Sequence, residues 1–154
     1  MIVNEMRPHV AVATGTGTTI HVLTAPYDHR DIFRGEYVNL YYDFSNAKSV
    51  GFHNVSQTEQ KIFVMMEQEG EVWKATGSSQ TQPKEGVFLR GVIKPNSHWI
   101  EYGIETYYIQ EGTGKAIELE NALQRRNRDG MRGIIVELVV ASDGKASVKE
   151  VHVP

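Results

Sequence analysis

The densest group of side chains able to carry out chemistry lies in residues 28–37. It holds three carboxylates, two guanidinium groups and one imidazole, which belong to Asp28, Asp31, Glu36, Arg30, Arg34 and His29. A carboxylate beside a histidine is a pairing that general acid–base catalysis uses. Asp31 or Glu36 would then act as the general base, with His29 next to it.

The same charges also have a structural explanation. Opposite charges this close in sequence pair with one another, and an exposed pair contributes only ~0–1 kcal/mol to stability. If the segment folds over the edge of a sheet, Arg30 or Arg34 would make bidentate contacts to Asp28, Asp31 or Glu36. Ion-pair networks perturb carboxylates as readily as active sites do. We therefore favour a structural role for the segment and keep the acid–base site as the alternative.

Other motifs in the chain do not complete a site. Ser45 and Lys48 have the Ser-x-x-Lys spacing of penicillin-binding acyl transferases, but the sequence lacks the Ser-Asp-Asn and Lys-Thr-Gly motifs of that chemistry. Residues 112–115 resemble a phosphate loop without its first glycine and its magnesium-binding hydroxyl. The six histidines form no pair at i+2, i+3 or i+4 spacing. We therefore expect no metal and no cofactor.

Length and composition indicate one ordinary globular domain. The chain has 154 residues, 40% of them hydrophobic, a formal net charge of -3 and no cysteine. Its acidic balance argues against a nucleic-acid partner, and the lack of cysteine excludes disulfides and thiol catalysis. The longest strongly apolar stretch, residues 133–141, is about half of the ~20 residues that a membrane-spanning helix needs. No signal-peptide core is present in residues 1–24, so we expect the chain as given to be soluble.

Hydrophobic periodicity predicts mostly strands in residues 18–154, with residues 1–17 as a flexible end. Gly70 predicts one hairpin turn, and the pair Asp143-Gly144 predicts another, of type I′. In residues 37–44, the side chains of Val38 and every second residue after it are expected to face inward, whereas Tyr37 faces away. The strands are expected at residues 18–25, 37–44, 61–68, 71–78, 87–94, 134–141 and 146–153, with one or two more in 99–109.

One helix is predicted at about residues 115–127, where Ala116, Leu119, Ala122 and Leu123 share a face. The predicted fold class is therefore mainly β. We expect an antiparallel sandwich or a partly open barrel of about eight strands, with one helix packed near the C-terminal third.

Residues 35–42, Gly-Glu-Tyr-Val-Asn-Leu-Tyr-Tyr, resemble the signature string after which the bacterial GDYXXLXY family is named. The preceding residues 25–34 are similar to the family's Ala-Pro-Val-Asp-Pro-Arg-Asp-Leu-Phe-Arg. Here Glu36 replaces the family's Asp and His29 replaces its Pro. The resemblance runs from about Thr14 to the end, and further similar stretches are residues 87–91, 102–108, 111–114 and the terminal hairpin.

The resemblance implies an extracytoplasmic, periplasmic domain held at the inner membrane by one N-terminal helix, which would lie just before Met1. Residues 1–17 would be its juxtamembrane remnant, and residues 18–154 a single domain. The family provides no activity to carry over, and its members occur beside integral membrane proteins. We therefore expect a non-catalytic module that binds an integral membrane protein. Its candidate binding residues are Asp28, Arg30, Asp31, Arg34, Glu36, Tyr37 and Glu105.

Two other functions stay open from the sequence. An envelope hydrolase or transferase would use Asp31, Glu36 and His29, together with Glu105 or Tyr107 from the second similar stretch, and it requires these groups to meet around one pocket. A small-ligand binder would use a barrel mouth or a cleft between sheets.

Overall fold

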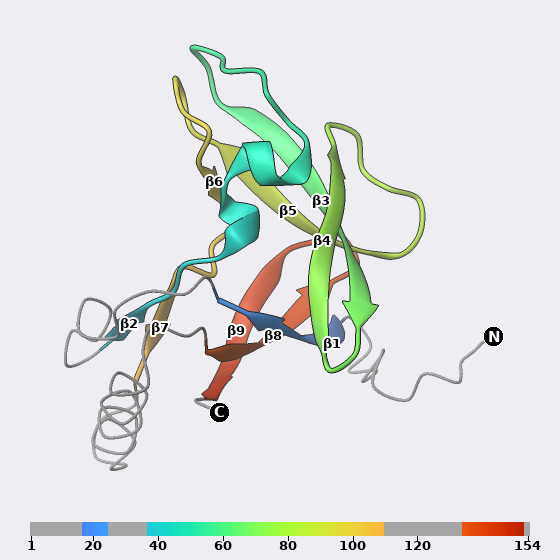
Figure 1. Cartoon of the computed structure of the whole chain (residues 1–154), viewed down its shortest axis with the longest axis vertical. Coiled ribbons are helices and arrows are strands. Elements are labelled where there is room, and N and C mark those ends of the chain that lie inside the picture. Colours follow the sequence, from blue (N-terminus) through green and yellow to red (C-terminus); the bar gives the residue numbers. More distant parts are fainter. Residues whose placement is uncertain (1–16, 25–36, 110–133, 153–154) are drawn as a thin grey trace.

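A computed structural model describes residues 17–24, 37–109 and 134–152 (Figure 1). These ranges hold nine strands, where about eight were predicted, and two short 3-10 helices. The prediction of a mainly β fold is confirmed for this part of the chain. The strands are β1 (Gly17–Leu23), β2 (Tyr37–Asn39), β3 (Gln60–Glu69), β4 (Val72–Ser79), β5 (Val87–Ile93), β6 (Ile100–Glu101), β7 (Thr106–Tyr108), β8 (Ile135–Ala141) and β9 (Ala146–His152), and the 3-10 helices are η2 (Asp43–Ser45) and η3 (Ala47–Val50).

The strands form three antiparallel sheets, as expected for the predicted class. The largest has the strand order β4-β3-β5-β6, the second has the order β1-β8-β9, and the third is the pair β2-β7. Figure 1 shows the β2-β7 pair at one side of the molecule, away from the crossing of β4 and β1. The described strands do not close into a barrel.

Both predicted hairpins are present. β3 and β4 pair across a tight turn in which Gly70 has a φ of 68°, a value that favours glycine. β8 pairs with β9 across residues 142–145. Turn chemistry therefore located both hairpins correctly from the sequence.

The turn between β8 and β9 is not the predicted type I′ turn. Gly144 donates its N–H to the carbonyl of Ala141 at 2.9 Å, so Ser142 and Asp143 are the central residues. A type I′ turn requires positive φ at both central residues, and Asn96 is the one non-glycine residue with positive φ in the described part. Gly144 follows with a φ of 90°, as in a type I turn completed by a left-handed glycine.

The predicted strand over residues 37–44 is shorter than expected and ends at Asn39. A strand needs an extended partner, and the chain opposite turns at residues 102–105, so the pairing stops there. Residues 43–50 form η2 and η3 instead; the side chain of Asn46 caps η3 by accepting a hydrogen bond from the N–H of Lys48 at 3.0 Å. The inward face was nevertheless predicted correctly, because its four side chains are at most 5% exposed: Val38, Leu40, Tyr42 and Phe44.

Two predictions concern residues beyond the described ranges. The helix at residues 115–127 lies outside the described residues, and so does the expected flexible end except for Gly17, which is the first residue of β1. Within the described ranges, no helix is both long and apolar enough to cross a membrane.

One hydrophobic cluster joins the three sheets. Alternate side chains of β1, β3, β4, β5 and β8 enter it, in agreement with the period of two that a half-buried strand shows. Its fully buried members include Ile20 and Val22 of β1, Ile62 and Val64 of β3, Leu89 of β5, and Val136 and Leu138 of β8. Because these side chains come from all parts of the described chain, the packing fixes the positions of the sheet edges and of the short β2-β7 pair.

We expect Gly91→Ala to lower the free energy of unfolding by about 1–3 kcal/mol, the usual cost of an extra methyl group in a packed core. A Cβ atom at Gly91 would lie 2.5 Å from Cγ2 of Ile100 and 3.0 Å from Cδ1 of Tyr102. Gly77→Ala is the matched control, because its Cβ would meet Cε of Met65 at an ordinary 3.5 Å. Urea unfolding measures both variants, and equal stability would contradict the tight packing of β6 against β5.

Candidate functional site

Tyr37 and Tyr108 form an aromatic pair on the two-stranded sheet. They stand directly opposite each other in the β2-β7 register, with ring centroids 5.8 Å apart. Tyr108 is 75% exposed, more than any other large hydrophobic side chain in the described part. We call Tyr37 and Tyr108 the tyrosine pair; it presents aromatic surface to the solvent at one side of the molecule.

The chain after β2 is tied to the chain before β7. The N–H of Leu40 donates to the carbonyl of Glu105 at 2.8 Å, and the hydroxyl of Tyr42 donates to the carbonyl of Ile104 at 2.7 Å. Leu40 and Tyr42 are both buried. A buried carbonyl without a hydrogen-bond donor lowers stability by about 1–3 kcal/mol. The hydroxyl of Tyr42 prevents this loss by donating to the carbonyl of Ile104.

A second buried tyrosine hydroxyl makes the reciprocal contact, from the later stretch of chain back to the earlier one. Tyr102 donates to the carbonyl of Phe44. The ring of Phe44 stacks on Tyr42 at 5.0 Å and meets the edge of Tyr102 at 5.3 Å between centroids. Burial, and then the negative charge of Glu105, raise the pKa of Tyr102 well above its usual range, so this hydroxyl stays protonated as a donor. We call Tyr42, Phe44 and Tyr102 the aromatic cluster.

Both carboxylate oxygens of Glu105 hold the turn that precedes β7. Oε2 accepts from the N–H of Tyr102 at 2.8 Å, and Oε1 accepts from the N–H of Gly103 at 2.9 Å. Gly103 has a φ of 90°, a value that suits glycine. Charge-assisted bonds of this kind are stronger than neutral ones, so the side chain of Glu105 fixes the local backbone.

A separate group of polar residues lies on the sheet β1-β8-β9. Nε2 of His21 and Nε2 of His152 each lie 3.5 Å from Oε1 of Glu137, and Nζ of Lys149 lies 3.3 Å from Oε2. The Glu137 side chain is 16% exposed. Its burial raises the pKa of Glu137, but hydrogen bonds from His152 and Lys149 and the charges of Lys149 and His21 outweigh burial and lower it below the usual value. Glu137 is therefore ionised at neutral pH.

No local pattern in the sequence predicts this group. His21, Glu137 and His152 lie on three different strands, so their spacing in the sequence does not indicate that they meet. The signal is the strand register, in which His21 stands opposite Glu137 and His152 stands opposite Ile135. The pairing of β8 with β9 follows from a hairpin that the sequence predicts. The pairing of β1 with β8 joins segments far apart in the chain, and the sequence does not predict it.

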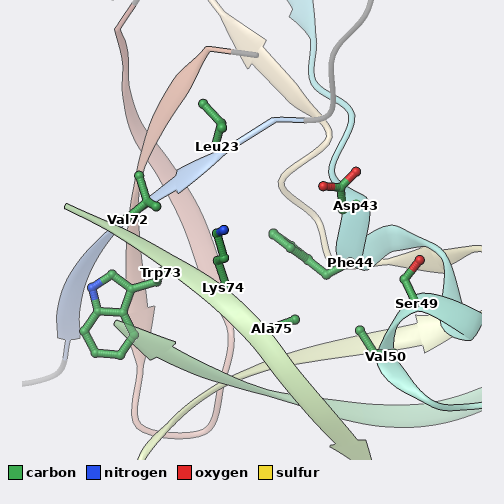
Figure 2. Close-up of a pocket in the computed structure, with 9 residues that line it drawn as sticks. All are labelled: Leu23, Asp43, Phe44, Ser49, Val50, Val72, Trp73, Lys74 and Ala75. Atoms are coloured by element: carbon green, nitrogen blue, oxygen red, sulfur yellow. The ribbon is translucent and has the colours of Figure 1, made fainter. Parts of the chain in front are cut away.

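The surface pockets of the described part are small, so they would hold at most a small ligand. A pocket of about 260 Å³ lies between β4 and the two 3-10 helices. Figure 2 shows the residues that line it, with the ring of Phe44 directed toward β4. Pockets for small molecules usually enclose about 300–1,000 Å³. A groove of about 390 Å³ beside β5 includes Lys61, Arg90 and Lys145, and Arg90 is already paired with Asp143 at 3.2 Å.

Comparison with known proteins identifies the family. A family model described as GDYXXLXY protein matches residues 9–151, nearly the whole chain. The chain belongs to the GDYXXLXY family. No curated protein and no solved structure matches it.

The structure gives the described part of the GDYXXLXY signature a physical meaning. Leu40 and Tyr42 are core residues, and Tyr37 belongs to the exposed tyrosine pair. The second stretch of family resemblance, residues 102–108, lies against the signature through β7 and the aromatic cluster. The two stretches of resemblance therefore contact each other in the fold.

Tyr37 and Glu105 are the two candidate binding residues within the described part. β2 and β7 bring their segments together, and the carboxylate of Glu105 is engaged with the backbone. The hydroxyl of Tyr107 lies 3.4 Å from Oε1 of Glu150 on β9. The other candidates lie outside the described residues: Asp28, His29, Arg30, Asp31, Arg34 and Glu36.

We expect Tyr102→Phe to lower the free energy of unfolding by about 1–3 kcal/mol, because the carbonyl of Phe44 loses its donor in a buried place. Tyr108→Phe removes a hydroxyl from an exposed ring and is the matched control, with no expected change. Urea unfolding of both variants measures the difference. A Tyr102→Phe variant as stable as the control would show that this hydrogen bond does not hold the fold.

The raised pKa of Tyr102 predicts a loss of stability at alkaline pH. An unfolded tyrosine releases its proton near pH 10, whereas folded Tyr102 retains it to higher pH. The stabilisation is therefore complete below about pH 10 and is lost as pH rises toward the folded pKa. We expect urea unfolding from about pH 9 to about pH 11 to show a steeper decline for the wild type than for Tyr102→Phe. Equal slopes would contradict the assignment.

Proposed function

We propose that this GDYXXLXY protein is a non-catalytic extracytoplasmic domain that acts by binding a protein partner through the tyrosine pair. The observation that carries the proposal is the exposed side chain of Tyr108, of which 75% is accessible to solvent. Tyr108 lies on β7, within residues 102–108, one of the stretches that resemble the family. Tyrosine is enriched in the well-packed centres of protein interfaces, where its ring is buried and its hydroxyl stays hydrogen-bonded.

The surroundings of the tyrosine pair support a preformed binding surface. The β2-β7 pair has three residues in each strand, too few for an independent hairpin. The aromatic cluster and the Leu40–Glu105 hydrogen bond hold it in place. A surface held rigidly loses little conformational freedom when a partner binds, which favours affinity.

The non-catalytic part of the proposal rests on Glu105. A general acid or base must reach the substrate, and both oxygens of this carboxylate accept backbone hydrogen bonds. The hydrolase or transferase alternative would need Glu105 or Tyr107 to leave these contacts and join Asp31, Glu36 and His29. Partner binding requires no such rearrangement.

The location and the kind of partner come from the family resemblance. For a GDYXXLXY member we expect one N-terminal membrane helix, an extracytoplasmic domain and a neighbouring integral membrane protein. We accordingly place the domain in the periplasm, anchored to the inner membrane, with an integral membrane protein as its partner and no nucleic acid.

For the architecture we propose a sandwich in preference to a partly open barrel. β1 of one sheet packs against β4 of another, and one apolar cluster fills the space between the sheets. Facing sheets that share a core in this way are typical of sandwiches.

Co-purification from membranes tests the function. The complete gene product is extracted from its native host under gentle solubilisation, as wild type, Tyr108→Ala and Val55→Ala. Val55 is the control because it is 50% exposed and lies outside the β2-β7 pair. We expect the wild type and Val55→Ala to retain one integral membrane protein in fixed stoichiometry and Tyr108→Ala to lose most of it, with unchanged thermal stability. Recovery of the bare monomer in the wild type would contradict the proposal.

A further inference from the structure

Three potential metal ligands meet on the outward face of the sheet β1-β8-β9. His21 and Glu137 are directly opposite each other in the β1-β8 register. His152 is opposite Ile135, which is two residues before Glu137 and so points to the same face. The backbone pairing of three strands therefore brings these side chains together, and the register between β8 and β9 shifts directly after Glu137.

The ligand atoms are spaced at nearly the distance that one metal ion requires. Nε2 of each histidine lies 3.5 Å from the same carboxylate oxygen of Glu137, and the three ligand atoms all lie within 4.8 Å of one another. Ligand bonds of about 2.0–2.2 Å put two ligands of a tetrahedral zinc ion roughly 3.4 Å apart. The two histidine–carboxylate separations already meet this value. The imidazole rings, with centroids 6.3 Å apart, need to approach only modestly.

The contacts inside this group are long: His152 makes a hydrogen bond to Glu137 at 3.5 Å, and His21 lies at the same distance as an ion-pair partner. A distance of 3.5 Å exceeds the usual 2.7–3.2 Å range of a hydrogen bond from nitrogen to oxygen. Nε2 of both rings nevertheless lies at this distance from the same carboxylate oxygen. An ion seated between the three atoms would satisfy all of them at once.

We propose that His21, Glu137 and His152 form a binding site for a divalent transition-metal ion of the zinc class. Two imidazoles and one carboxylate are a donor set that zinc uses, whereas magnesium and calcium prefer oxygen ligands. The side chains of His21 and His152 are 42% and 50% exposed, so the ion reaches the site from solvent and completes its coordination with water.

Lys149 is compatible with a bound cation because the two oxygens of Glu137 face different partners. Oε1 faces the histidines, and Oε2 faces Nζ of Lys149 at 3.3 Å. The lysine side chain is 59% exposed, so solvent screens its charge. A hydrogen bond to the far oxygen of a ligating carboxylate orients that ligand, as outer-shell partners of metal sites do.

Titration of the untagged, metal-stripped chain with ZnCl₂ tests the site by calorimetry. We expect one zinc ion per chain, with affinity lowered at least about tenfold in His21→Ala and in His152→Ala, since even a lost outer-shell contact commonly weakens binding that much. The control is His53→Ala, because His53 is exposed and lies outside the cluster. It is expected to bind as the wild type does, and Mg²⁺ should give no saturable signal.

A second readout separates binding from folding. Zinc that binds the folded chain raises the melting temperature by mass action. We expect this rise in the wild type and in His53→Ala and its loss in His21→Ala and His152→Ala, while all four proteins melt alike without metal. The proposal is wrong if the wild type shows no saturable zinc binding. It is also wrong if the two cluster variants bind zinc as tightly as the wild type.

Discussion

Two buried tyrosine hydroxyls connect residues 42–44 with residues 102–104. The rest of the described structure depends on these two stretches of chain. Tyr42 reaches the carbonyl of Ile104 across 62 residues, and Tyr102 reaches that of Phe44 across 58 residues. Each hydroxyl satisfies a carbonyl that water cannot reach, so loss of either contact leaves a buried polar group unpaired. These bonds explain how a pair of three-residue strands keeps its place, and the pair in turn displays Tyr37 and Tyr108.

The β2-β7 pair and the three-stranded sheet are linked through Tyr107. Its hydroxyl on β7 lies 3.4 Å from Glu150 on β9, and Glu150 stands opposite Glu137 of β8. Two carboxylates opposite each other in a sheet repel, and here each has its own polar contacts. Tyr107 contacts Glu150, while Lys149 and the two histidines surround Glu137. The charges on this face are therefore arranged around Glu137.

Local features of the fold followed from the sequence, and long-range features did not. Gly70 and Gly144 indicated the positions of the two hairpins. The alternation from Val38 to Phe44 predicted which side chains are buried even beyond the end of the strand, because these side chains pack into the core whatever the local backbone structure. The end of β2 depends on Glu105, more than 60 residues away in the chain, and the histidine cluster depends on the pairing of β1 with β8. No local pattern encodes these contacts, and the predicted charged segment at residues 28–36 lies outside the described residues.

Native-state hydrogen exchange at two amides tests most directly whether the aromatic cluster is integral to the fold. The N–H of Leu40 bonds to Glu105, and that of Ala47 bonds to the carbonyl of His98 at 2.7 Å, so both report on the junction of the two stretches. If the junction holds the architecture together, these amides exchange only by global unfolding, with the same free energy as amides in the centre of β3. Exchange of Leu40 and Ala47 by local opening, while β3 remains protected, would contradict the account.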